Sequence, residues 1–185
     1  DPDERTPMCG VPYHSAEAYI ARLIAKGYKV AICEQTEDPA LAKGLVQRDV
    51  IRIITPGTVT ESSMLEEGKS TYIGAVYLAS REGGAAFCDV STGEFCCAAF
   101  DGDAVSHIIN ELGRFAPREV ILSPGAKENE HIYELVTRKL EAMPESASES
   151  FEYLPASVLL CRQFGFTDID QCGLDGQPGA VCAAG

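Results

Sequence analysis

The stretch PMCGVPYHSAEAYIARLIAKGYKVAICEQTEDP, residues 7–39, contains the signals of a turn, a helix and a strand in close succession. Gly10 and Pro12 interrupt any regular element before Ser15, whose hydroxyl is suited to cap the N-terminus of a helix. Apolar residues then recur at helical spacing, so one face of the helix is apolar. The short apolar run at residues 30–33 predicts a strand that is buried on both faces.

The first part of the chain continues with a second apolar run at residues 50–54, which predicts another strand. One helix and two strands make a thin core for residues 1–55, because small domains bury little of their surface. We therefore interpret residues 1–55 as a piece of a larger domain whose beginning lies outside this sequence. The polar residues that follow, up to position 70, predict a linker.

The second part changes to strand patterns with short turns, which predicts an antiparallel meander of three strands followed by alternating helices and strands. The expected strands are residues 72–79, 85–90, 94–100, 118–122 and 151–153, and the expected helices are residues 103–112, 132–140, 158–164 and 178–185. Residues 143–150, MPESASES, predict a solvated acidic loop. This order of elements is that of an RNase H-like α/β domain.

The net charge of −13 is unevenly distributed. Residues 1–55 carry 8 acidic and 7 basic side chains, whereas residues 56–185 carry 20 and 8, so the nets are −1 and −12. Non-specific affinity for DNA comes mostly from Lys and Arg that neutralise phosphates. We therefore expect the second part to bind a protein rather than nucleic acid. No apolar run has the length of a membrane span and no signal-peptide pattern is present, so we expect no membrane association.

The eight cysteines do not form a disulfide or zinc pattern. The sequence has no Cys-x-x-Cys, and its histidines have no cysteine at metal-ligand spacing. Cys33, Cys88 and Cys161 lie inside apolar runs, where a free thiol acts as a small hydrophobic side chain. These features favour reduced structural cysteines, no bound metal and a cytoplasmic location.

Several motifs resemble one known family. They are Met-x-Gly-x-Pro-Tyr-His at residues 8–14, Val-Ala-Ile-Cys-Glu-Gln at 30–35, Arg-Ile-Ile-Thr-Pro-Gly-Thr at 52–58 and Asp-Val-Ser-Thr-Gly-Glu-Phe at 89–95. Together they closely resemble MutS, the family of DNA mismatch-recognition ATPases. The resemblance spans nearly the whole chain.

The resemblance implies a division into three parts. Residues 1–55 would be the C-terminal part of the mismatch-recognition domain, residues 56–70 a linker, and residues 71–185 the RNase H-like connector domain. The chain would be non-catalytic, because the ATPase domain that uses ATP and Mg²⁺ lies outside it, and it would need no cofactor of its own. The family implies mismatched double-stranded DNA, MutL and a second MutS copy as partners of the full-length protein.

The resemblance also implies where DNA contacts lie, in the loop that runs beside the mismatch near the minor groove. The candidate DNA-contacting residues are Met8, Gly10, Pro12, Tyr13, His14 and Arg52. Apolar side chains often wedge against base steps in the minor groove. The alternative is that the apolar loop residues pack onto the following helix as a hydrophobic staple, and that Arg52 is a solvated surface charge.

Two other interpretations belong to different functional classes. An RNase H-like nuclease needs several carboxylates that converge on Mg²⁺, and Asp89 and Glu94 are the only nearby acids, since residues 72–79 contain none. The structural interpretation, which we favour, is that Asp89 accepts hydrogen bonds in a turn and Glu94 is solvated. An independent DNA-binding module is disfavoured by the negative charge. Phe164 and Phe166 flank a helix stop and belong either to the core of the connector, which we favour, or to a partner surface.

Overall fold

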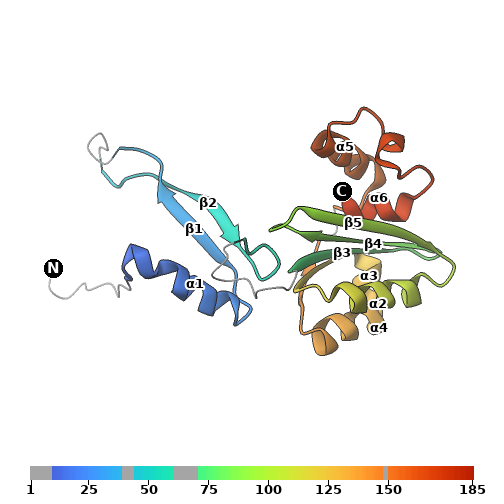
Figure 1. The fold of residues 1–185 in the computed structure, drawn as a ribbon, viewed down its shortest axis with the longest axis horizontal. Coiled ribbons are helices and arrows are strands. Elements are labelled where there is room, and N and C mark those ends of the chain that lie inside the picture. Colours follow the sequence, from blue (N-terminus) through green and yellow to red (C-terminus); the bar gives the residue numbers. More distant parts are fainter. Residues whose placement is uncertain (1–9, 39–43, 61–70, 148–149) are drawn as a thin grey trace. The chain divides into compact units, whose positions relative to one another are not determined.

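The computed structural model describes residues 10–38, 44–60, 71–147 and 150–185. It is a mixed α/β structure, as predicted, and it divides into two compact units, residues 1–55 and 56–185. Figure 1 shows the elements of both units, and each unit is described by itself. Met8, residues 39–43 and most of the predicted linker lie outside the described residues.

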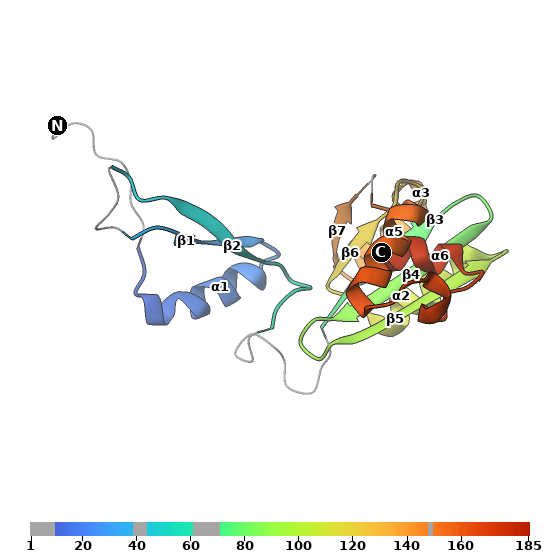
Figure 2. The ribbon, with the colours of Figure 1, turned by 90° about the horizontal axis from the view of Figure 1, so that it is seen from above.

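The first unit is one helix against a two-stranded antiparallel sheet (Figures 1 and 2). Its elements are the 3₁₀ turn η1 (Tyr13–Ser15), the helix α1 (Ala16–Ile24), β1 (Val30–Gln35) and β2 (Arg48–Ile54). Directly opposite residues on paired strands share a face of the sheet, so Val30 lies beside Ile54. Ile54 is 1% exposed.

Two local expectations in this unit were wrong. Ser15 occupies the N-cap position, but its side chain makes no capping hydrogen bond, because the η1 turn leads into the helix directly. The strand β1 is not buried on both faces: Val30 and Ile32 are half-buried, whereas Ala31 and Cys33 are exposed. In a sheet with a helix on one face, successive side chains alternate between covered and open sides.

The second unit is built on a five-stranded mixed sheet with the strand order β5-β4-β3-β6-β7. The strands are β3 (Tyr72–Leu78), β4 (Glu82–Asp89), β5 (Glu94–Asp101), β6 (Glu119–Leu122) and β7 (Met143–Ser146). β3, β4 and β5 form the antiparallel meander, β6 pairs parallel to β3, and β7 pairs parallel to β6. This topology agrees with the RNase H-like class predicted from the order of elements.

Helices cover both faces of this sheet (Figures 1 and 2). They are α2 (Ala104–Phe115), α3 (Pro124–Glu128), α4 (Glu130–Glu134), the π-helix η2 (Leu135–Lys139), α5 (Tyr153–Phe164), the 3₁₀ turn η3 (Ile169–Cys172) and α6 (Pro178–Ala184). The helix α2 begins where predicted, with the Asp103 carboxylate accepting from the Ser106 amide. The main core lies between the sheet and α2 with α4, and it includes Val76, Ile108, Leu112 and Val120, all of which are fully buried.

On the opposite face, α6 crosses the sheet at very close range. A Cβ atom on Gly84 of β4 would overlap the carbonyl group of Gly179 in α6, and a Cβ on Gly179 would overlap the carbonyl oxygen of Gly83. The two backbones can approach this closely only because neither position carries a side chain. The helix α5 then packs onto α6 through Ala156, Leu160 and Val181.

Two predictions for the second unit were wrong. Residues 143–146 are not a solvated loop but the edge strand β7, and the expected strand at 151–153 is replaced by the start of α5 at Tyr153. Proline is tolerated on an edge strand, where its missing N–H costs no ladder bond, so Pro144 does not exclude β7. Likewise Pro155 lies in the first turn of α5, where backbone N–H groups have no helical partner.

Candidate nucleic-acid interface

The loop that leads into α1 places four of the candidate residues together on the surface. Gly10, Pro12, Tyr13 and His14 are all exposed, and Tyr13 is 92% exposed. The turn is closed by a hydrogen bond of 2.9 Å from the Ser15 amide to the Pro12 carbonyl. The Tyr13 ring therefore does not pack onto α1 as a hydrophobic staple would require, and its face is available to a ligand.

Arg52 lies on a different element from that loop. It is the residue of β2 opposite Ile32 of β1, and it is half-buried. Because cross-strand partners share a face, Arg52 lies on the side of the sheet that carries Ile32. The structure thus brings Gly10, Pro12, Tyr13 and His14 into one turn and places Arg52 apart, in the sheet. Met8 lies outside the described residues.

The other side of the same strand pair is an apolar surface that sequence reasoning did not find. Val50, Ile51 and Ile53 of β2 are 56%, 56% and 58% exposed. The register shifts between Ile32 and Cys33, which is the irregularity that lets Val50 and Ile51 both face outward. The signal was present in the sequence as four apolar residues within positions 50–54, but such a cluster is equally typical of a buried strand.

Asp89 at the end of β4 is buried and fully used as a hydrogen-bond acceptor. Its Oδ1 accepts from the Ser91 hydroxyl at 2.6 Å, the Ser91 amide at 2.9 Å and the Thr92 amide at 3.3 Å, and its Oδ2 accepts from the Thr71 amide at 3.2 Å. Burial raises the pKa of this carboxyl, but the hydrogen bonds from Ser91, Thr71 and Thr92 outweigh it and leave the pKa below its usual value. Asp89 therefore closes the β4–β5 turn.

Glu94, the second acid considered for metal chemistry, lies at the exposed start of β5. Its Oε2 accepts from the Tyr72 hydroxyl at 2.8 Å.

Within the described residues, no group of three or more His, Cys, Asp or Glu side chains is arranged to hold a metal ion. The cysteines within the described residues are free thiols. Cys33 is exposed, whereas the apolar run that contains it suggested a buried side chain. Across those ranges, no helix has the length and apolar character needed to cross a membrane.

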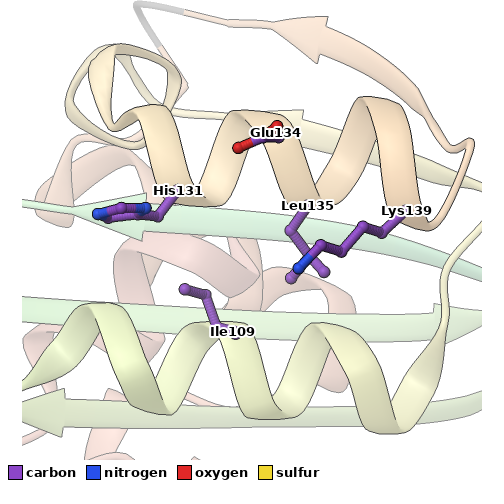
Figure 3. A pocket seen from close by; sticks show the side chains of 5 residues that line it. All are labelled: Ile109, His131, Glu134, Leu135 and Lys139. Carbon is purple, nitrogen blue, oxygen red and sulfur yellow. The ribbon is translucent and has the colours of Figure 1, made fainter.

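A shallow pocket of about 140 Å³ lies between α2 and the helical pair α4–η2 (Figure 3). Ile109 points from α2 toward the α4–η2 pair, Leu135 points back toward α2, and His131, Glu134 and Lys139 complete the lining. Glu134 also forms an ion pair with Arg138, with Oε1 and Nη1 2.9 Å apart. The lining contains no thiol or hydroxyl group.

A second exposed surface lies on α5 of the second unit. Leu154, Val158 and Leu159 are 74%, 65% and 52% exposed, and we call these three residues the α5 apolar face. The other side of α5 is buried on α6. Phe164 is half-exposed, and its ring centroid lies 5.8 Å from that of Phe95 in β5, so its ring is only partly packed.

Two family models match the two parts of the chain. The model of MutS domain I matches residues 1–63, and the model of MutS domain II matches residues 71–185. The chain belongs to the MutS family. The resemblance seen in the sequence motifs is thereby confirmed.

Individual MutS relatives are similar over most of this chain. The DNA mismatch repair protein MutS of Acetivibrio thermocellus is 47% identical over 163 residues, which cover 88% of this chain and 19% of that protein. The protein of the same description from Symbiobacterium thermophilum is 43% identical over 182 residues, covering 98% of this chain and 21% of that protein. The chain thus spans about a fifth of the length of these MutS relatives.

Among solved structures, a PPX-GPPA enzyme of Aquifex aeolicus is similar with a TM-score of 0.29 and 9% identity, over 48% of this chain and 40% of that chain. A likeness at that level carries no argument about this MutS chain.

Proposed function

We propose that this chain forms part of the mismatch-binding and connecting region of a cytoplasmic DNA mismatch repair protein. The first unit would contact mismatched double-stranded DNA, and the second would couple that contact to the ATPase core and to MutL. The match of both MutS domain models in sequence order is the observation that supports the proposal most directly. In the full-length protein a second MutS copy would complete a dimer.

The DNA contact is assigned to the exposed turn before α1. Tyr13 offers an aromatic ring that is 92% exposed, held by a short turn whose preceding residue is a proline of fixed φ. Aromatic rings stack on bases, and apolar residues enter the minor groove beside them. Residues 1–55 are nearly neutral, with a net charge of −1, so few of their side chains would neutralise DNA phosphates. This contact would therefore depend on base stacking and on the fit of the turn to the groove.

The partner contact is assigned to the α5 apolar face. Leu154, Val158 and Leu159 form an exposed apolar patch on a unit whose part of the chain has a net charge of −12. Apolar patches rimmed by polar residues mark sites of protein association. An acidic unit repels the DNA backbone, so a protein such as MutL is the occupant that the charge favours.

The chain itself would perform no chemistry. It contains no Gly-x-x-x-x-Gly-Lys-Ser/Thr phosphate loop, so its residues do not fit an ATP and Mg²⁺ site of that kind. ATP and Mg²⁺ would be bound elsewhere in a full-length protein. The nuclease alternative gains no support, because both carboxylate oxygens of Asp89 already accept hydrogen bonds from the turn.

The test is a titration of this chain with the N-terminal domain of MutL, with and without mismatched duplex, read by surface plasmon resonance. We expect saturable binding that weakens when Val158 is replaced by Asp. Parallel anisotropy measurements use a labelled mismatched duplex and its fully paired counterpart. No binding in either titration, from a chain shown to be folded by circular dichroism, would refute both assigned surfaces for this chain.

A further inference from the structure

The residues directly after β2 are held by the second unit. Residues 56–60, here called the strap, belong to that unit, although the sequence predicts a linker there. The Gly57 amide donates to Oε2 of Glu119 across 3.4 Å, and the Glu119 side chain is buried, with the residue 4% exposed. Val59 is also buried, at 5% exposure. The strap is therefore packed rather than solvated.

The strap lies on the first residues of the neighbouring strands β3 and β6. Ile73 of β3 and Glu119 of β6 are register partners, and Gly57 lies over both of them. A Cβ on Gly57 would come within 3.0 Å of the Glu119 Cβ and 3.1 Å of the Ile73 Cβ. These atoms belong to stiff parts of two strands rather than to flexible side-chain ends, so only glycine fits without displacement.

The connection that remains between β2 and the strap is short and conformationally restricted. β2 ends at Ile54, and only Thr55 and Pro56 lie between Ile54 and Gly57. Proline has a fixed φ, and the residue before a proline is restricted to extended conformations. Only Thr55 therefore lies between the end of β2 and the strap, and its backbone conformation is restricted by Pro56.

We propose that the strap is a mechanical connection in which Glu119, acting as a latch on Gly57, ties the end of β2 to the central strands of the connector. A movement of the first unit would then pass into β3 and β6 instead of being absorbed by a loose linker. The role in coupling rests on the proposed function, whereas the latch itself does not. Glu119 would in this sense be a positioning residue.

The test is ¹⁵N relaxation and amide exchange on the full chain, without DNA or partner. We expect the Gly57 amide of the wild type to be protected from exchange, and Gly57→Ala to reduce the protection of the strap amides by about tenfold or more. Release of the strap would also lower the ratio of transverse to longitudinal relaxation rates for amides of residues 10–38, because the first unit would tumble more freely. Gly113→Ala is the matched control, since a Cβ there meets nothing within 4 Å.

A second variant keeps the test valid should Gly57→Ala fail to fold. Glu119→Gln retains the size of the side chain but removes its charge, and we expect a smaller loss of Gly57 protection with a correspondingly smaller loss of coupled tumbling. Unprotected exchange of Gly57 in the wild type, or unchanged relaxation in both variants, would overturn the proposal. The relaxation and exchange measurements contain no DNA or MutL. Their outcome is therefore independent of the binding titrations, and a failure of the proposed function can be distinguished from a failure of the latch.

Discussion

The Ser91 hydroxyl donates to the Asp89 carboxylate over 2.6 Å, and the same oxygen also accepts from the Ser91 and Thr92 amides. This arrangement fixes the turn between β4 and β5. It also supports the structural interpretation of the acid, because a carboxylate that accepts these hydrogen bonds organises the backbone of the turn.

Replacement of Asp89 by Asn should therefore destabilise the second unit rather than alter any reaction. Asn presents an amide group to one of the backbone donors and lacks the charge that strengthens the bonds, so we expect a loss of about 1.5–3 kcal/mol in the free energy of unfolding. Urea titration of both proteins measures it. Glu94→Gln, at an exposed position, is the control and should change stability by no more than about 0.5 kcal/mol. Equal effects of the two substitutions would contradict the structural role of Asp89.

The same carboxylate predicts how stability depends on pH. The pKa of Asp89 is lower in the folded than in the unfolded chain, so its contribution is complete above the unfolded value of about 3.9 and declines as pH falls through the folded value. Unfolding free energies measured from pH 6 down to pH 2, each at constant ionic strength, should fall less steeply in Asp89→Asn than in the wild type. Parallel curves would show that other carboxylates dominate acid unfolding.

Tyr13 and Tyr28 provide a matched pair for the DNA contact. Both rings are exposed, at 92% and 59%, but only Tyr13 lies in the turn before α1. In the full-length protein, Tyr13→Ala should lower the affinity for mismatched duplex by about 5- to 150-fold. This range corresponds to about 1–3 kcal/mol for the loss of one aromatic stacking contact. Tyr28→Ala should leave it unchanged. Fluorescence anisotropy at fixed salt distinguishes the two, and equal losses would remove the assignment to the turn.

Two residues on opposite sides of α5 separate binding from folding. Val158→Asp places a charge on the α5 apolar face and should weaken MutL binding, while the free energy of unfolding changes by about 0.5 kcal/mol or less. Leu160 is 4% exposed, and Leu160→Ala should cost about 2–5 kcal/mol in stability. Titration calorimetry and urea unfolding on the same samples provide both readouts. Retained MutL affinity in a folded Val158→Asp variant would place the partner surface elsewhere.

The crossing of α6 over β4 predicts a large effect of a single methyl group. Gly84→Ala would drive a Cβ into the Gly179 backbone and should cost at least about 3 kcal/mol, because neither backbone can move without opening the sheet face. Gly113→Ala in α2, where the added Cβ is free of neighbours, should instead stabilise by about 0.5–1 kcal/mol. Thermal unfolding of both variants measures these changes. A Gly84→Ala variant as stable as the wild type would contradict the close contact between α6 and β4.

Much of the fold was predictable where one local signal decided the outcome. The three strands of the meander, the Asp103 cap and the glycine that ends α5 each have a single short-range cause in the sequence. The errors arose where tertiary pairing overrode local character. Residues 143–146, Met-Pro-Glu-Ser, have little strand propensity of their own, and they become a strand because β6 offers an open edge.

The candidate sites show the same division. The turn before α1 was recognisable from its Gly, Pro and aromatic residues, although its exposure was not, because a hydrophobic staple has the same sequence pattern. The open apolar side of β1–β2 could not be predicted, since a run of apolar residues does not reveal which face is covered. The strap was also missed, because its packing depends on Glu119, far away in sequence.

The meeting of Gly84 and Gly179 limits how this domain can diverge. Each glycine excludes a side chain because of the backbone opposite, so the two positions are bound to one another despite their distance along the chain. A substitution at either one forces the helix away from the sheet, and the buried partners of α6 would have to enlarge to fill the gap. A single substitution of either glycine disrupts the contact between α6 and β4. We therefore expect both positions to remain glycine for as long as the helix lies this close to the sheet.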